Sequence, residues 1–281
     1  MDSVMVAAVQ LSSGVDSANN VKDAIALVNG AADRGATHIQ LPEYFNYLGP
    51  AKGFGDVAES IPGPITAQMS DVASSRKVTL HIGSLLEISP TPGKFFNTSV
   101  VINSTGHIVA TYRKIHLFDV DIPGAVAQRE SDFITPGRDL VMVNVDGVRL
   151  GLSVCFDIRF PEMYRELARS GADVLAIPAA FNAVTGRAHW EILIRSRAIE
   201  NHAFVVAAAQ VGTTDEGIAT FGHSLIIDPW GEILAESTSG GPDVITAVLD
   251  LHEVTKRRQQ IAVMDYRRPD LYNQAVHVVE D

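Results

Sequence analysis

Short apolar segments alternate with amphipathic segments along almost the whole chain. An apolar segment bounded by turn residues is typical of a buried strand, and apolar residues spaced three and four apart indicate a helix. The sequence predicts strands over 4–9, 38–41, 78–83, 96–102, 107–112, 141–145, 148–154, 174–177, 204–210, 224–227, 232–235 and 244–249. It predicts helices over 17–32, 64–76, 161–170, 188–202 and 251–261.

Short turns join three of the predicted strand pairs into hairpins. The turns are 103–106, 146–147 and 228–231, and the second is Asp-Gly, the strongest short hairpin signal. Hairpins interleaved with helices indicate an α/β layered domain with a mixed sheet. No Ser- or Pro-rich linker interrupts the 281 residues, so we expect one domain over 1–281, with 265–281 as a tail that packs on a partner subunit.

The charge balance argues against two classes of partner. The chain has 22 Lys and Arg against 33 Asp and Glu, a net charge of -11, and no basic stripe offsets this. Nucleic acid and an anionic membrane surface both require positive charge, so neither is expected as a partner. The start of the chain has no basic leader, and its apolar runs are shorter than a membrane span, which predicts a cytoplasmic location.

The chain contains one cysteine, Cys155, and nine histidines. A single cysteine excludes an intramolecular disulfide and a cysteine-rich zinc site. The histidines show no metal-ligand spacing such as His-x-x-x-His, and the chain has neither a Walker lysine motif nor a Gly-x-Gly-x-x-Gly motif. We therefore expect neither a metal nor a cofactor.

Cys155 lies between the predicted strand 148–154 and the helix that Pro161 opens. A residue on such a bend is exposed above the carboxyl end of a sheet, where α/β sites form, and backbone N–H groups after it can face an oxyanion. The alternative is inert packing, because free cysteine is among the most buried residue types. The polar residues within 156–162 favour a catalytic thiol.

Two charged residues follow other predicted strands. Glu43 comes directly after the strand 38–41, and Lys114 ends the strand that begins at His107. Taken singly, each charge is typical of a solvated loop. Together with Cys155 they can converge at one edge of an α/β sheet.

Three segments together resemble the catalytic motifs of a known family. They are Leu41-Pro42-Glu43, Tyr112-Arg113-Lys114-Ile115-His116-Leu117 and 151–162, which reads Gly-Leu-Ser-Val-Cys-Phe-Asp-Ile-Arg-Phe-Pro-Glu. Their order and separation are similar to those of the nitrilase superfamily, the carbon–nitrogen hydrolases, and the resemblance covers nearly the whole chain. It implies a triad of Glu43, Lys114 and Cys155 on an α-β-β-α sandwich that dimerises into a four-layer stack.

Further segments resemble one branch, the Nit-type amidases, which includes omega-amidases and deaminated glutathione amidases. These segments are 178–182, 185–186, 188–191 and 195–200. The branch usually has proline after its Thr-Gly turn, where this chain has Arg187, a cation near the pocket wall. The resemblance implies hydrolysis of a small carboxylate-bearing amide: deaminated glutathione or the omega-amide of a 2-oxo acid. The alternatives are a nitrilase, an N-carbamoyl amino-acid amidohydrolase and a non-catalytic binding protein on the same fold.

The resemblance also assigns chemical roles. Cys155 attacks the amide carbonyl and forms a thioester, and Glu43 moves the protons. Lys114 and the backbone N–H of Phe156 stabilise the oxyanion. Glu130 matches a second family glutamate that positions Lys114 and the substrate, although a carboxylate there is equally typical of a surface loop.

The same branch implies two substrate-binding residues. Arg159 contacts the substrate carboxylate, and Thr185 lines the same pocket. An arginine suits a carboxylate because its planar fork can bind both oxygens. The alternative for Arg159 is a salt bridge to Glu162 or Asp157.

The predicted helix 188–202 is apolar over more than one face. Residues at helical spacing are Trp190, Leu193, Ile194, Arg197 and Asn201. Ile192 and Ile199 add apolar surface elsewhere on the helix, which indicates contacts beyond its own sheet. The family pairs protomers through neighbouring helices, so we expect a homodimer or a multiple of dimers.

Overall fold

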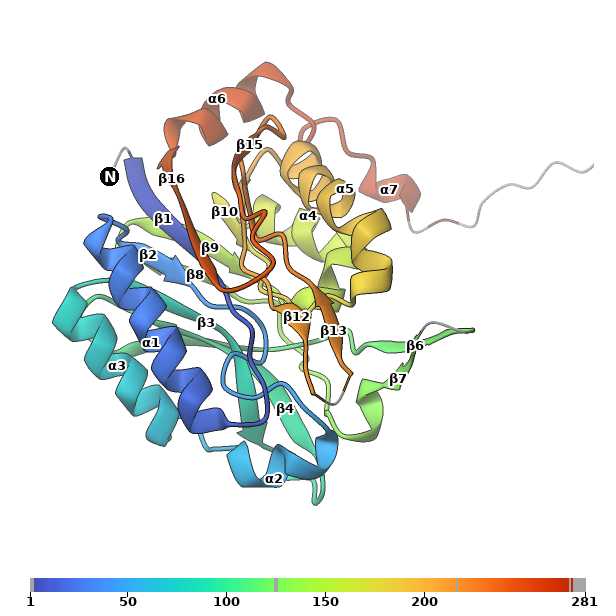
Figure 1. Ribbon diagram of the computed structural model, residues 1–281. Helices are drawn as coiled ribbons and strands as arrows, with labels where there is room; N and C mark the ends of the chain where they lie inside the picture. Colours follow the sequence, from blue (N-terminus) through green and yellow to red (C-terminus); the bar gives the residue numbers. More distant parts are fainter. Residues whose placement is uncertain (1–2, 124–125, 216, 273, 275–281) are drawn as a thin grey trace, which may run out of the picture.

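The computed structural model describes residues 3–123, 126–215, 217–272 and 274. Two six-stranded sheets pack face to face, and helices cover the outer face of each (Figure 1). The α-β-β-α sandwich implied by the resemblance is therefore confirmed. In the described part of the chain, no helix has both the length and the apolar character needed to cross a bilayer.

The first sheet has the order β16-β1-β2-β3-β4-β5, and the pairs β1–β2 and β2–β3 are parallel. Its strands are β1 (Ser3–Gln10), β2 (His38–Gln40), β3 (Thr79–Ile88), β4 (Phe95–Ile102), β5 (Ile108–Arg113) and β16 (Asp243–Asp250). Helices α1 (Ser17–Asp33) and α3 (Pro64–Arg76) cover its outer face, where one of the two main apolar cores lies.

The second sheet has the order β15-β14-β11-β10-β9-β8, and the pairs β9–β10 and β10–β11 are parallel. Its strands are β8 (Met142–Val145), β9 (Val148–Leu152), β10 (Val174–Ala176), β11 (Phe204–Ala207), β14 (Leu225–Ile227) and β15 (Ile233–Glu236). Helices α4 (Pro161–Arg169) and α5 (Ala183–Asn201) cover its outer face. The larger apolar core lies both beneath these helices and between the two sheets.

The remaining elements are short and connect or extend the two layers. They are η1 (Ala51–Gly53), α2 (Phe54–Val57), β6 (Asp119–Ile122), β7 (Val126–Arg129), η2 (Glu130–Asp132), η3 (Cys155–Arg159), β12 (Val211–Thr213), β13 (Ala219–Phe221), α6 (His252–Gln260) and α7 (Pro269–Tyr272). The hairpins β6–β7 and β12–β13 project beside each other at one side of the sandwich (Figure 1). The apolar pattern did not predict them because their strands are only three or four residues long.

Helix α5 begins five residues earlier than the sequence predicts. The Asn182 side chain caps it by accepting from the Val184 N–H at 2.9 Å. The Thr-Gly pair suggests a turn, but Gly186 lies inside the first turns of the helix. A Cβ there would come within 2.4 Å of Phe221 on β13, so this glycine allows a close approach of helix and hairpin.

The topology brings three chain segments to one end of the sandwich. The carboxyl end of β2 leads to Glu43, that of β5 to Lys114 and that of β9 to Cys155. A parallel bridge between Leu11 and Gln210 joins the two sheets at the same end. This is the edge of an α/β sheet at which sites form.

Candidate active site

Glu43 is buried directly after β2, with 2% of its surface exposed. Its Oε1 accepts from Lys114 Nζ at 2.9 Å and from Asn97 Nδ2 at 2.9 Å. Its Oε2 accepts from the Ala180 N–H at 2.8 Å. Gly83 on β3 makes room for this turn, because a Cβ there would lie 1.9 Å from the Leu41 carbonyl oxygen. The carboxylate is thus held rigidly by three donors from three separate segments.

Lys114 follows β5, and only 2% of its surface is exposed. Its ammonium donates to Glu43 and also to both oxygens of Glu130, at 3.1 and 2.9 Å. Burial disfavours the charged amine, but the carboxylates of Glu130 and Glu43 outweigh it and hold the pKa of Lys114 well above its usual range. Lys114 is therefore a permanent cation.

Glu130 is a buried member of this cluster and not a charge on a surface loop. It is 6% exposed, and its oxygens also accept from the Tyr44 hydroxyl at 3.0 Å and the Phe118 N–H at 2.7 Å. Burial raises the pKa of its carboxyl, but Lys114 and the hydrogen bonds outweigh it, so the pKa is lowered. The cluster holds two carboxylates around one ammonium.

Cys155 begins η3 at the bend after β9, with a positive φ of 51°. Such a backbone is uncommon outside glycine, and strained conformations of this kind cluster at functional sites. The Cys155 N–H donates to the Pro178 carbonyl at 2.8 Å, which holds the bend in place. Burial, and then the charge of Glu43, raise the pKa of the Cys155 thiol well above its usual value. The thiol is protonated at rest, with the Glu43 carboxylate beside it.

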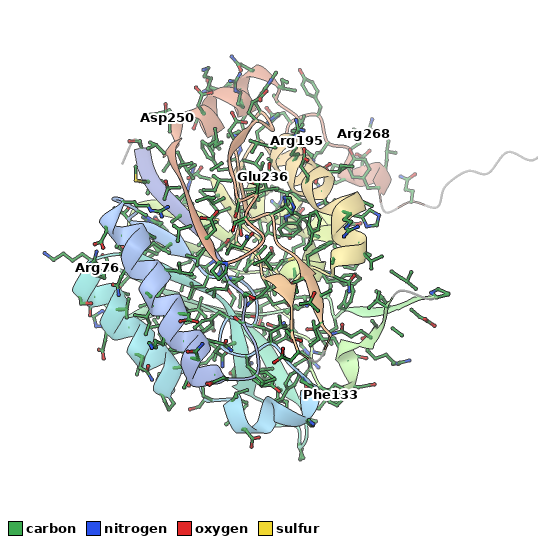
Figure 2. The ribbon with its side chains drawn as sticks, viewed as in Figure 1. Arg76, Phe133, Arg195, Glu236, Asp250 and Arg268 are labelled. Carbon is green, nitrogen blue, oxygen red and sulfur yellow. The ribbon has the colours of Figure 1, made fainter. Side chains whose placement is uncertain are left out.

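A cavity of about 790 Å³ opens above these side chains. Glu43, Lys114, Glu130, Cys155, Phe156 and Thr185 all line it. The far wall is aromatic: Phe54 packs on Phe133 with ring centroids 6.2 Å apart, and Figure 2 labels Phe133 at that end of the molecule. The structure thus brings together the triad, the second glutamate, Phe156 and Thr185 around one cavity.

Arg159 is not among the residues that line the cavity. Its guanidinium is 5.7 Å from the centroid of Phe156 and 5.5 Å from that of Phe181, and it contacts His189 at 3.3 Å. In the described part of the chain it pairs with no carboxylate, so the salt bridge to Glu162 or Asp157 is absent. Arg187 is exposed and does not line the cavity either.

The sequence from 5 to 259 matches the family described as carbon-nitrogen hydrolase. The chain belongs to this family. It is 40% identical to the deaminated glutathione amidase of Mus musculus, over 97% of this chain and 86% of that protein. It is 38% identical to the omega-amidase NIT2 of Homo sapiens, over 97% of this chain and 98% of that protein.

Solved structures of the family share the fold. The NitFhit protein of C. elegans superposes with a TM-score of 0.89 at 34% identity, over 97% of this chain and 67% of that one. Nit3 of Saccharomyces cerevisiae, a member of the nitrilase superfamily, superposes with a TM-score of 0.85 at 31% identity, over 95% and 97%. The chain is therefore a carbon–nitrogen hydrolase, and the buried Glu43–Lys114 pair beside Cys155 suits that chemistry.

Two contributors to this hydrolase site were not predicted from the sequence. Asn97 on β4 is fully buried and donates to Glu43 and, at 3.2 Å, to Glu130. Its backbone carbonyl also accepts from the backbone N–H of Lys114 at 2.9 Å, so one residue contacts both carboxylates and the backbone of the lysine. The Ala180 N–H is the second. The one available signal was an amide side chain within the apolar strand 96–102, which does not by itself indicate a site.

Proposed function

We propose that this hydrolase cleaves the amide of a small carboxylate-bearing substrate, either deaminated glutathione or the omega-amide of a 2-oxo acid. The proposal is supported by the names of the two relatives above. The observation that carries the chemistry is the Glu43 carboxylate held between Lys114 and the Ala180 N–H, in a cavity that contains Cys155.

The first half of the reaction forms a thioester. Glu43 takes the thiol proton, and the sulfur of Cys155 attacks the amide carbonyl carbon, whose oxygen becomes an oxyanion. Lys114 and the Phe156 N–H stabilise this charge. In the described part of the chain the Phe156 N–H has no acceptor of its own, so it is available. Glu43 then returns the proton to the nitrogen, the C–N bond breaks, and ammonia leaves.

The second half of the reaction restores the thiol. Glu43 accepts a proton from a water molecule as that water attacks the thioester carbon. The second oxyanion forms at the same place and uses the same donors, Lys114 and the Phe156 N–H. Its collapse breaks the C–S bond, Cys155 recovers its proton from Glu43, and the carboxylic acid product leaves.

Arg159 supplies the positive charge for the substrate carboxylate in this proposal, and Thr185 lines the cavity. The guanidinium has no acidic partner in the described part of the chain, and burial lowers its pKa, so a carboxylate at this place would relieve an unpaired charge. Because the Arg159 guanidinium lies near the rings of Phe156 and Phe181, which both line the cavity, we expect its side chain to move toward the cavity when substrate binds.

A substrate panel tests the proposal. Ammonia release is measured for deaminated glutathione, 2-oxoglutaramate, a neutral amide, a nitrile and an N-carbamoyl amino acid. We expect turnover of one or both carboxylate-bearing amides, and Cys155→Ala retaining less than about one hundredth of it. Arg159→Lys should lose activity on those amides and keep it on the neutral one, because the bidentate fork is lost. Preference for the nitrile or the carbamoyl compound would refute the proposal, and equal losses on both amide types would make Arg159 structural.

A further inference from the structure

Asp157 lies two residues after the nucleophile and is fully buried, with 0% of its surface exposed. Its Oδ1 accepts from the His116 N–H at 3.0 Å and contacts His116 Nδ1 at 2.7 Å. Its Oδ2 accepts from the Tyr112 hydroxyl at 2.7 Å and from the Val154 N–H at 2.8 Å. One carboxylate therefore has four partners, two on each oxygen.

These partners belong to the two segments that carry the reacting groups. Tyr112 and His116 flank Lys114 by two residues on either side, and Val154 immediately precedes Cys155. Lys114 comes from the first sheet and Cys155 from the second. Stacking of His116 on Phe160, with centroids 3.6 Å apart, adds a second contact between the same segments. Asp157 thus links the sheets beside the cavity.

We propose that Asp157 is a positioning residue that aims the Phe156 N–H and Lys114 at one oxyanion. This inference rests on the proposed cysteine mechanism. An oxyanion hole requires its donors to converge within a few tenths of an ångström. Lys114 is held by Glu43 and Glu130, and the Cys155 N–H is held by Pro178, but the peptide that carries the Phe156 N–H lies between Cys155 and Asp157. The carboxylate is the anchor of that peptide.

A carboxylate is required there because both backbone partners can only donate. The His116 and Val154 N–H groups approach different oxygens of Asp157. An asparagine has one acceptor oxygen, so its NH₂ group must face one of the two N–H groups in either orientation. Such a buried donor–donor contact leaves both groups unsatisfied, and the η3 turn shifts to relieve it. Asp157→Asn therefore changes the hole with little change in volume.

The test measures turnover per reactive thiol. This ratio separates an effect on the position of the oxyanion donors from an effect on the amount of folded protein. Cys155 is the one cysteine of the chain, so iodoacetamide alkylation counts intact sites and reports on the thiol and its base. For Asp157→Asn we expect kcat per alkylatable thiol to fall by about 30-fold or more, which approaches the loss of one oxyanion donor. KM and the alkylation rate should stay within about threefold of wild type, because Glu43 is held by Asn97 and Ala180.

Asp173→Asn is the matched control. Asp173 is 6% exposed, lies just before β10 at the opposite end of the strands, and pairs with Arg149 at 2.7 and 2.8 Å. This variant should lower the melting temperature but leave kcat per thiol unchanged. If Asp157→Asn behaves in the same way, or if its alkylation rate falls in step with turnover, the inference is overturned.

A second variant decides the matter if Asp157→Asn does not fold. Tyr112→Phe removes one of the four contacts and leaves the carboxylate in place, and we expect kcat per thiol to fall about three- to tenfold at unchanged alkylation rate. An unchanged kcat per thiol in Tyr112→Phe would contradict the inference. A wild-type protein whose thiol alkylates but whose amides are not hydrolysed would refute the proposed function instead, so the two failures are distinguishable.

Discussion

At the scale of single residues, the site places the protonated thiol of Cys155 beside the Glu43 carboxylate, which three hydrogen bonds hold in place. Burial and Glu43 both raise the pKa of Cys155, so in the proposed mechanism the thiolate forms when Glu43 removes the proton. Lys114 offsets part of this, because its charge lowers the pKa of the same thiol. The charges of Glu43 and Lys114 therefore act on the same thiol in opposite directions.

Glu43→Gln should lower kcat by about a hundredfold or more, because glutamine cannot accept the thiol proton. Alkylation of Cys155 by iodoacetamide should slow by a comparable factor at neutral pH. Glu59→Gln is the matched control: Glu59 is 7% exposed and accepts from the Ile65 and Thr66 N–H groups, but it does not line the cavity. A Glu43→Gln protein that alkylates and turns over like the Glu59→Gln protein would remove Glu43 from the mechanism.

At the scale of elements, α5 shows how a helix can serve both core and cavity. Its first turns carry Thr185 on the cavity wall, and its middle buries Trp190 and Ile194 against the second sheet. Between these regions Gly186 packs against Phe221 of β13. This contact joins the helix to the β12–β13 hairpin, whose Ile218–Ala219 end also lines the cavity. A glycine that lowers helix propensity is retained where two elements meet closely.

Gly186→Ala should lower the melting temperature, because the added Cβ would lie 2.4 Å from the Phe221 side chain. Overpacking of this kind costs about 1–3 kcal/mol, which exceeds the gain in helix propensity. Gly30→Ala in α1 is the control, since a Cβ at Gly30 meets nothing within 4 Å. That variant should raise stability by up to about 1 kcal/mol. Thermal unfolding of both proteins checks the pair, and equal stabilisation would contradict the packing argument.

At the scale of the whole molecule, buried polar side chains join the two sheets. Gln40 on β2 accepts from the Ala208 N–H of the other sheet at 2.8 Å and contacts His81 Nδ1 at 3.1 Å. His81 is 3% exposed, and burial lowers its pKa to about 3. The interface between the sheets therefore requires a neutral imidazole.

This requirement predicts an acid dependence of stability. Between its ordinary pKa of 6.5 and its folded pKa of about 3, His81 binds a proton only in the unfolded chain. The free energy of unfolding contributed by the neutral form is present above pH 6.5 and is lost as the pH falls, by at most about 1.4 kcal/mol per pH unit. Denaturant titrations should show a shallower acid slope for His81→Gln than for wild type. The exposed His107→Gln protein should retain the wild-type slope, and an unchanged slope in both variants would contradict the prediction.

The oligomeric state of the chain is also predicted at the scale of the whole molecule. Ile192 is 67% exposed and Ile199 is 47% exposed on α5, and Tyr266 and Tyr272 at the start of the tail are 82% and 62% exposed. Residues 273 and 275–281 of the proposed tail lie outside the described residues. Exposed apolar side chains of this size are typical of an interface. We expect the 30.2 kDa chain to scatter light as a species of about 60 kDa or a multiple of it.

Ile192→Glu should weaken this assembly, because it places a charge within the apolar face of α5. Truncation after Met264 should weaken it through the tail. Glu191→Gln, an exposed position one residue away from Ile192, is the control and should leave the mass of the assembly unchanged. A mass of about 30 kDa for the wild-type chain at micromolar concentration would rule out the dimer.

Much of the architecture follows from local patterns in the sequence. The predicted segments 4–9, 38–41 and 148–154 correspond to β1, β2 and β9, because buried strands require continuous apolar residues. Turn chemistry was equally informative at Asp146–Gly147, where both residues have positive φ in the structure. The β6–β7 hairpin was missed because its strands are four residues long, contain several polar residues and, among the described residues, pair only with each other.

The residue pattern by itself indicated an α/β layered domain, because strands and helices depend on residue types at short spacing. The resemblance of three motifs implied the sandwich, the family and the triad of Glu43, Lys114 and Cys155. Only the tertiary structure decided which charges are buried together. Asn97 contacts Glu43 across 54 residues of chain, and Lys114 contacts Glu43 across 71, a range at which no local pattern carries information. Asp157 lies in the segment 151–162 that resembles a family motif, but only the tertiary structure identifies the four groups that it contacts. The reason is physical: a buried charge depends on the donors around it, and those donors come from whichever segments the sheets bring together.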